Sequence, residues 1–419
     1  MNRVVITGLG VIAPSGIGKE EFWSNTREGK SFSRRLEFSE LPGDYSRPDD
    51  LPDVKSRVNA QVEGFQTDEF QGKERYIQFA LEGASLAIKD SGIDVEAINN
   101  DDMGVVFSTA IGGSPYMDSE FYKLTDKGSK ELKFQCEDNL LYEASMFNTA
   151  ARLISQKYNC GNVCTTVSTG CTGGLDAIGY AYDTIRCGEA KVLIAGTAEA
   201  PLSPLSFAAF DVINALTKNN EDFKKASRPF DVKRSGFVFS EGCGIVVLEE
   251  LEHALARKAH IYGEVVGFSS GNNAYHMTDL PKDGSALGDV ILKALEQNNS
   301  GKHVDYINAH GSSTPQNDVF ETDAYKYAFG SDVYNIPISA SKSMIGHPLS
   351  SASSIGLISA LLAMENKFLP PTINYESPDP RCDLDYIPNV GRHKDVESVL
   401  ITASGFSGIH SAMILKKFK

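Results

Sequence analysis

The chain has 419 residues, which is too long for one average domain and suits two fused α/β halves. Its formal net charge of −15 argues against nucleic acid or an anionic membrane as a partner. Hydrophobic residues make up 41% of the chain, as in an ordinary globular protein. No uninterrupted apolar run approaches the roughly 18 residues of a membrane span.

Strand-like runs alternate with helix-like segments, which predicts an α/β architecture with buried sheets. The runs fall into two series of about five, so we expect two similar halves, residues 1–250 and 259–419, joined near Leu251–Lys258. Phe32–Phe70 is rich in Pro, Asp and Ser and predicts a surface insertion. The first series is Val4–Ile6, Met103–Phe107, Val163–Val167, Val192–Ala195 and Gly244–Leu248; the second is Tyr262–Phe268, Val304–Asn308, Ile336–Ser339, Ser398–Thr402 and Ser411–Leu415.

The cysteines suit a reduced state. They are scattered, and their spacing forms no metal-ligand cluster, so no metal site is expected. The odd count, and an N-terminal segment too short and too Gly-broken for a signal sequence, indicate reduced thiols in the cytoplasm. The seven positions are 136, 160, 164, 171, 187, 243 and 382.

Cys171 lies where a β-branched run gives way to a Gly-rich turn and then to apolar residues at helical spacing, in VSTGCTGGLDAIGYA. A helix N-terminus stabilises negative charge, so the position predicts a low-pKa thiol that acts as a nucleophile. Taken alone, a small buried cysteine that opens a core helix fits equally well.

Two histidines strengthen the catalytic interpretation. His310 follows an apolar run in YINAHGSSTPQND, and His347 stands in ISASKSMIGHPLSSASS before the apolar segment Ile355–Met364. Each lies on a polar turn after a predicted strand. Cysteine with histidine is the minimum set for activated acyl transfer.

These segments resemble the β-ketoacyl-acyl-carrier-protein synthases of the thiolase superfamily. The resemblance runs from VVITGLGVIAPSG to GFSGIHSAMIL and includes RPFDVKRSGFVFSEG, NAYHMTDL, NAHGSSTPQND and SKSMIGHP in the family's order. STGCTGGLD, PDPRCDLDYIP and SGFSGIHSAM are most similar to the alpha ketosynthase of type II aromatic polyketide synthases. The resemblance implies a layered α-β-α-β-α thiolase fold and a decarboxylative condensation of malonyl-carrier protein with a Cys-bound acyl or polyketide chain.

The resemblance also implies roles for individual residues. Cys171 would accept the acyl chain, its backbone N–H and that of Phe406 would hold the oxyanion, and His310 and His347 would stabilise the enolate. Lys342 would act electrostatically, with a surface lysine that caps a helix as the alternative. Phe406 would gate the site, with plain core packing as the alternative. Hydroxyls expected along the pantetheine channel are those of Thr278, Ser312 and Thr314.

The expected partner is an acyl carrier protein whose phosphopantetheine arm brings the substrates, so no separate cofactor is expected. Because such carriers are acidic, docking requires a local basic patch, for which the candidates are Lys73 with Arg75 and Lys224 with Lys225; solvated faces are the alternative for both. The resemblance further implies a heterodimer with a chain-length-factor subunit.

Two other functions stay open. One is a fatty-acid 3-oxoacyl-carrier-protein synthase II that acts as a homodimer, and the other is a non-catalytic chain-length subunit, against which Cys171 argues. Ser235, Pro348 and Ile409–His410 depart from the family pattern and bear on loop shape and partner fit.

Overall fold

The computed structural model describes residues 1–37, 39, 41, 53–132, 140–298 and 303–419.

Ten main strands form two sets with one topology. In each set the strands, numbered by their order in the chain, lie side by side as 3-2-4-5-1, with parallel pairs 3-2 and 2-4 and antiparallel pairs 4-5 and 5-1. The first set is β1 (Val4–Ala13), β5 (Met103–Ser108), β6 (Cys164–Val167), β7 (Val192–Glu199) and β9 (Gly242–Glu250). The second is β10 (Gly263–Asn272), β11 (Tyr306–Asn308), β12 (Ile338–Ser339), β15 (Ser398–Ser404) and β16 (Ile409–Lys416).

The repeated topology agrees with two similar halves, and every strand predicted from the sequence is present. Antiparallel pairing of β1 with β10 joins the two sets into one continuous sheet. The linker between them contains α8 (Leu251–Ala256). The division at residues 250 and 259 itself stays a prediction.

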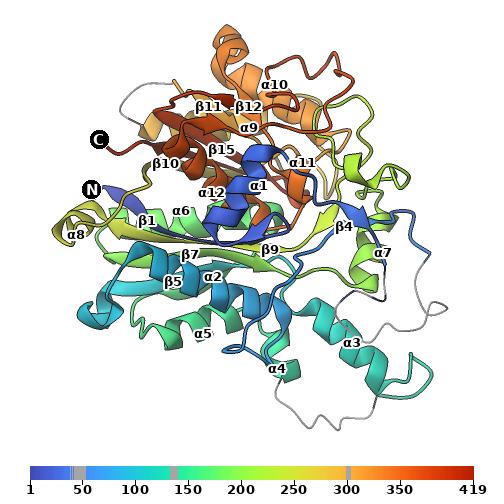
Figure 1. Ribbon diagram of the computed structural model, residues 1–419, viewed down its shortest axis with the longest axis horizontal. Helices are drawn as coiled ribbons and strands as arrows, with labels where there is room; N and C mark the ends of the chain where they lie inside the picture. Colours follow the sequence, from blue (N-terminus) through green and yellow to red (C-terminus); the bar gives the residue numbers. More distant parts are fainter. Residues whose placement is uncertain (38, 40, 42–52, 133–139, 299–302) are drawn as a thin grey trace.

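The molecule has five layers, visible edge-on in Figure 1. Helices α6 (Gly173–Arg186) and α12 (Ser351–Asn366) lie between the two halves of the sheet and contact both. Each residue of α12 from Ser351 to Met364 is buried, as expected of a helix enclosed on all sides. The outer layers are α2 (Arg75–Ser91) and α5 (Thr149–Lys157) on the first half, and α9 (Ser285–Gln297) and α10 (Asn317–Phe329) on the second. This is the predicted α-β-α-β-α arrangement.

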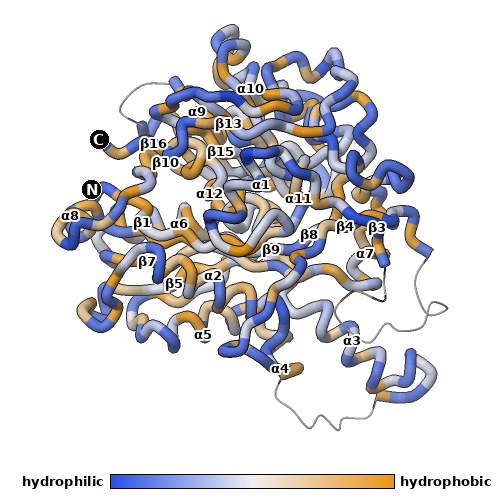
Figure 2. Tube along the Cα trace, in the orientation of Figure 1, coloured by the Kyte–Doolittle hydropathy of each residue, from blue (hydrophilic) through white to orange (hydrophobic). Residues whose placement is uncertain are grey.

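The core follows the sheet. Hydrophobic residues concentrate along β5, β7 and β9, whereas the longest hydrophilic stretches lie at the periphery (Figure 2). β6 lies at the end of the strand order, with Cys164 exposed and its other side chains half-buried. The sheet therefore has an edge next to the Cys171 turn. Among the described residues, no helix combines the length and the apolar character needed to cross a membrane.

The remaining elements are peripheral. The predicted insertion contributes β3 (Arg34–Arg35) and β4 (Val58–Ala60), which form a small sheet with β8 (Phe239–Ser240); residues 42–52 of it lie outside the described residues. The other helices are α1 (Lys19–Glu28), α3 (Ser114–Leu124), α4 (Leu140–Ser145), α7 (Pro204–Val212) and α11 (Lys342–Ile345), and the short strands are β2 (Gly16–Ile17), β13 (Phe368–Leu369) and β14 (Arg392–His393).

Candidate active site

Cys171 lies in a sharp turn between a strand and a helix. β6 ends at Val167, Gly170 adopts a left-handed conformation with φ of 61°, and a helical turn, Gly170–Thr172, leads into α6. Glycine adopts this conformation without the penalty that a Cβ brings. The turn leaves the half-buried Cys171 facing a cavity.

That cavity, of about 290 Å³, gathers the predicted residues from distant parts of the chain. The imidazole rings of His310 and His347 line it with centroids 5.3 Å apart and planes at 79°. The other predicted residues in its lining are Phe406, Thr278, Ser312 and Thr314. The predicted nucleophile, the two imidazoles and the predicted pantetheine contacts therefore line one cavity, while Lys342 is buried behind it.

The histidines are held through their backbones. Glu321 accepts the N–H groups of His310 at 2.7 Å and Gly311 at 2.8 Å, and the His347 N–H donates to the Val238 carbonyl at 2.8 Å. His310 follows β11 as predicted. His347 instead follows the short helix α11, which the sequence pattern did not predict.

Both imidazoles are neutral. Burial and the nearby charge of Lys342 hold the pKa of His310 and that of His347 well below the ordinary value. The Nδ1 atom of each ring is buried without a hydrogen-bond partner, so Nε2 is the nitrogen left to serve the cavity. A neutral ring with its proton on Nε2 donates to an oxyanion without a metal.

Lys342 is not a surface residue. Its ammonium donates to the His310 carbonyl oxygen, and burial lowers its pKa to about 8, against the attraction of Glu321. The alternative of a helix-capping surface lysine is therefore wrong. The buried ammonium charge lowers the pKa of both histidines. It also opposes the rise in the Cys171 pKa that burial causes.

The Cys171 thiol differs from the sequence prediction. Burial raises its pKa to about 11, and the charge of Lys342 and the backbone N–H groups of Cys171 and Phe406 only partly offset this. The resting thiol is protonated, so a low-pKa thiol was the wrong expectation. The same two N–H groups point at the sulfur, where they can receive an oxyanion.

Phe406 lies at the cavity rather than in the core. It is 36% exposed, and its ring stacks on that of Phe210 with centroids 6.5 Å apart. Packing in the core is therefore the wrong alternative. Sequence reasoning also missed Ser404 and Gly405, which line the cavity and belong to the SGFSG segment. It missed Glu199 as well. Burial raises the pKa of Glu199 to about 7, and its charge raises the pKa of Cys171.

The docking candidates separate into two groups. Arg75 binds Glu241 through two hydrogen bonds of 2.9 and 2.6 Å, and its side chain is only 21% exposed. Lys73 pairs with Glu143 at 2.8 Å. Arg75 therefore joins α2 to the core, which corrects its assignment to docking. Lys224 is exposed on the surface, and Lys225, also at the surface, pairs with Glu376 at 2.6 Å.

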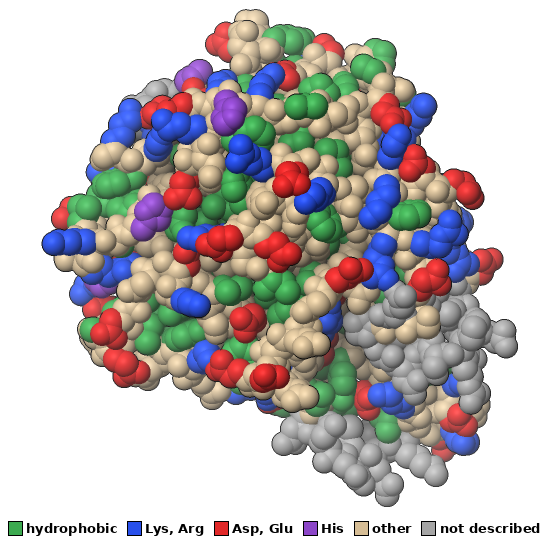
Figure 3. Space-filling view, viewed as in Figure 1, with side chains coloured by type: hydrophobic (Ala, Val, Ile, Leu, Met, Phe, Trp, Pro, Cys, Tyr) green, Lys and Arg blue, Asp and Glu red, His purple; other side chains and the backbone are tan. Residues whose placement is uncertain are grey.

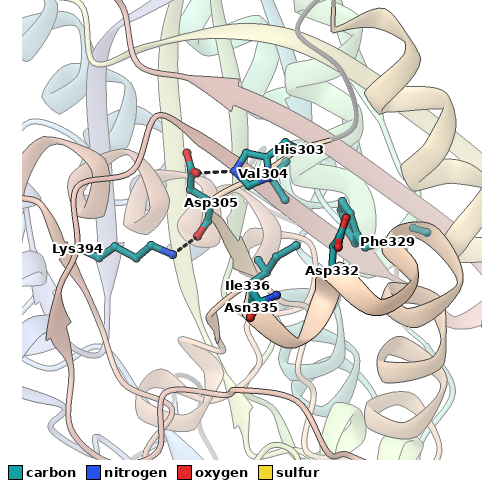
Figure 4. A pocket seen from close by; sticks show the side chains of 9 residues that line it. His303, Val304, Asp305, Phe329, Asp332, Asn335, Ile336 and Lys394 are labelled. Carbon is teal, nitrogen blue, oxygen red and sulfur yellow. Dashed lines mark hydrogen bonds and ion pairs between the residues drawn. The ribbon is translucent and has the colours of Figure 1, made fainter.

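A second cavity, of about 540 Å³, is separate from this site. It lies at the amino end of β11, whereas His310 follows the carboxyl end. His303 pairs with Asp305 at 2.8 Å, and Lys394 donates to the Asp305 carbonyl at 3.0 Å (Figure 4). These groups bind one another along the cavity wall, and none of the residues that line this cavity also lines the Cys171 cavity.

Lys342 supports a prediction about pH. Replacing it by Met removes a charge that lowers both histidine pKa values, so these values should rise toward 6.5. The neutral fraction at pH 6 then falls, so the decarboxylation that the resemblance implies should have its acid limb at higher pH. A pH–rate profile of Lys342→Met measures this shift. Lys326→Met, which removes a surface lysine paired with Asp383, is the matched control, and an unmoved acid limb in Lys342→Met would contradict the assignment.

Known proteins match the chain over its length. Residues 1–254 match the family model of the beta-ketoacyl synthase N-terminal domain, and residues 262–376 match that of the C-terminal domain. A putative polyketide beta-ketoacyl synthase 1 of Streptomyces halstedii is 40% identical over 99% of this chain and 97% of its own. The tetracenomycin polyketide synthase ketoacyl synthase alpha subunit of Streptomyces glaucescens is 41% identical over 100% and 97%. A 3-oxoacyl-[acyl-carrier-protein] synthase 2 of Synechocystis is 38% identical over 100% and 98%.

Solved structures match equally fully. A type II polyketide synthase acyl-carrier protein in complex with its ketosynthase bound to the hexaketide gives a TM-score of 0.92 at 41% identity and 100% coverage of both chains. The ishigamide ketosynthase/chain length factor gives 0.89 at 31% identity, again with full coverage of both chains.

Proposed function

Because the chain belongs to the beta-ketoacyl synthase family, we propose that it is the condensing ketosynthase of a type II polyketide pathway. The observation that carries this proposal is the convergence of Cys171, His310 and His347 on one cavity. The relatives named as polyketide synthases, at 40 and 41% identity, favour polyketide over fatty-acid substrates. The Synechocystis relative, at 38%, keeps the fatty-acid enzyme as the alternative.

The first step is acyl transfer from the carrier's phosphopantetheine thioester. The Cys171 sulfur attacks the thioester carbonyl carbon, and the N–H groups of Cys171 and Phe406 hold the resulting oxyanion. Collapse of this intermediate breaks the carbon–sulfur bond to the carrier. Because the resting thiol is protonated, its proton leaves during the attack and passes to the departing carrier thiolate.

The second step is decarboxylative condensation. A malonyl thioester loses carbon dioxide, and the electron pair of the broken carbon–carbon bond forms an enolate whose oxygen accepts hydrogen bonds from His310 and His347. The enolate carbon attacks the acyl carbonyl carbon on Cys171, the carbon–sulfur bond to the cysteine breaks, and the released thiolate takes up a proton from solvent water. Neutral imidazoles can perform this step, since each ring still carries one N–H that donates to the enolate oxygen.

We expect the chain to act as a heterodimer with a chain-length-factor subunit. Among the described residues β6 pairs only with β5, so one edge of this strand is open beside the Cys171 turn, where it presents the exposed Cys164. Nearby in the fold, α3 contacts both α4 and α7, and these helices expose large apolar side chains, which mark an interaction surface. The exposed side chains are Phe121, Tyr142, Leu205 and Val212.

Co-expression tests the proposed function. The chain should be poorly soluble or inactive alone, and it should be soluble and elongate malonyl-derived chains when produced with its partner. Mass spectrometry of the purified complex would identify a second subunit that lacks the nucleophile. A fully active homodimer that elongates fatty acyl chains would instead establish the alternative.

For carrier docking we propose a surface called here the basic strip, made of Lys55, Arg57, Arg35 and Lys224. Lys55 Nζ contacts Asn214 Oδ1, at the cavity lining, at 3.3 Å. The Arg57 carbonyl accepts the N–H of Leu36, next to Arg35, and β3 contacts the helical turn that bears Lys224. Lys and Arg side chains gather over β3 and β4 in Figure 3. The strip therefore leads from the cavity along β3 and β4.

Charge reversal should separate this strip from α2. Lys55→Glu with Lys224→Glu should weaken carrier binding at least about tenfold at low salt, and added salt should reduce the difference, because exposed charges are screened. Binding is measured by titration at two ionic strengths. Lys73→Glu is the matched control, and an equal loss in that variant would favour the α2 surface instead.

A further inference from the structure

His410 and Ser411 are adjacent residues of β16. Each hydrogen-bonds to a segment next to one of the two proposed oxyanion donors, the N–H groups of Phe406 and Cys171. Successive side chains of a strand point to opposite faces, so His410 faces α10 and Ser411 faces α6. The His410 ring stacks on Phe320 of α10 with centroids 5.1 Å apart. The Ser411 hydroxyl donates to the Asp176 carboxylate of α6 at 2.5 Å.

Asn273 fixes the proton of the His410 ring. The Asn273 side-chain oxygen accepts the Tyr275 N–H at 3.0 Å, so its Nδ2 is the atom that lies 3.1 Å from His410 Nε2. An amide nitrogen only donates, so Nε2 accepts, and Nδ1–H donates to Ser404 Oγ at 2.9 Å. Burial lowers the pKa of His410 to about 4, which keeps the ring in this neutral form.

The bond to Ser404 acts on the hairpin that carries Phe406. Ser404 and His410 face each other across its base, and the Gly405 N–H donates to the Ile409 carbonyl at 2.8 Å. A side chain at Gly405 would place its Cβ 3.4 Å from the Cys171 backbone nitrogen. Because the hairpin base lies this close to the nucleophile, its position sets where the Phe406 N–H points.

The bond from Ser411 acts on the other donor. Asp176 also accepts the hydroxyls of Thr169 at 2.5 Å and Thr172 at 2.6 Å, which lie on either side of Cys171. The carboxylate thus holds the turn that presents the Cys171 N–H. Through Ser411 this turn is tied to the strand that also carries His410.

We propose that His410 and Ser411 are positioning residues that fix the separation of the two oxyanion donors, the N–H groups of Cys171 and Phe406. The proposal rests on the proposed function, because it concerns the acyl-transfer step. His410 stands at one of the positions where the chain departs from the family pattern. An imidazole here supplies one donor and one acceptor from a single rigid ring.

The test separates acyl loading from decarboxylation. His410→Leu should slow loading of Cys171 from an acyl carrier about 10- to 100-fold. This loss does not exceed the roughly 100- to 1000-fold cost of removing a whole oxyanion donor. Malonyl-carrier decarboxylation, measured in a Cys171→Ala background, should change less than about threefold, because it uses His310 and His347. His410→Gln should restore loading, since an amide also supplies one donor and one acceptor.

A double-mutant cycle identifies the bond itself. Ser404→Ala should reproduce the loading defect, and adding it to His410→Leu should slow loading no further, because the bond between the two side chains is already lost in His410→Leu. His253→Leu is the control. His253 is a partly buried histidine of the remote helix α8 and binds Glu249 of β9 at 2.7 Å, so its replacement reports a loss of stability alone.

The outcomes are distinguishable. Wild-type protein that does not load acyl chain on Cys171 would overturn the proposed function and this inference together. Wild-type protein that loads, while His410→Leu loads equally fast or loses loading and decarboxylation in equal proportion, would overturn the inference alone. Additive effects of the two variants would also overturn it.

Discussion

Replacing Cys171 by Ala should abolish condensation, with a loss of at least about 10⁴-fold in product formation, because no other group in the cavity forms the acyl-enzyme bond. Malonyl decarboxylation should persist in this variant, since the two histidines remain. Product is measured by chromatography of the carrier-bound β-ketoacyl chain, and carbon dioxide release is measured separately.

The raised pKa of Cys171 determines which reagent is informative. Cys164 and Cys187 are exposed, whereas burial raises the pKa of the Cys171 thiol to about 11. A simple alkylating reagent at neutral pH therefore does not select Cys171. An acyl thioester does select Cys171, because the N–H groups of Cys171 and Phe406 stabilise only the oxyanion formed at the Cys171 sulfur. Cys187→Ala, which removes an exposed cysteine away from the proposed interface strand, is the matched control and should retain condensation. Retained product formation in Cys171→Ala would show that another residue is the nucleophile.

His310→Ala and His347→Ala should each lose decarboxylation by about 100- to 1000-fold, the usual cost of removing one oxyanion donor. Loading of Cys171 should fall much less, because its oxyanion is held by backbone N–H groups. The two rates are measured as carbon dioxide release from malonyl carrier and as acyl-enzyme formation by intact-protein mass spectrometry.

The third buried histidine near the site provides a contrast. His410 takes part in the hairpin bonds and does not line the cavity, so its variants should show the opposite pattern, with loading affected more than decarboxylation. Normal decarboxylation in both His310→Ala and His347→Ala would contradict the enolate assignment.

The sequence predicted the architecture well because the core strands are locally apolar and bounded by turns. All ten predicted runs coincide with strands, and Cys171, His310 and His347 lie in motifs whose order along the chain is informative. The two-fold repeat was also predicted, although the pairing of β1 with β10 was not.

The errors arose where distant segments meet. Arg75 appears in the sequence as part of a basic cluster, but Glu241, 166 positions away, binds it. The start of α6 predicts a low thiol pKa, yet the cavity that buries Cys171 is built from several separate segments, and their desolvation dominates. Local pattern therefore identified the reacting groups, while their protonation and exposure required the fold.

Acyl-enzyme trapping tests the central claim most directly. The purified protein with its partner is incubated with acyl carrier protein, quenched and digested, and the peptide that spans Cys171 is analysed by mass spectrometry. We predict an acyl adduct on Cys171 that disappears when malonyl carrier is added, with an equal yield of the chain extended by two carbons. An adduct on another cysteine, or extension without any adduct on Cys171, would contradict the account.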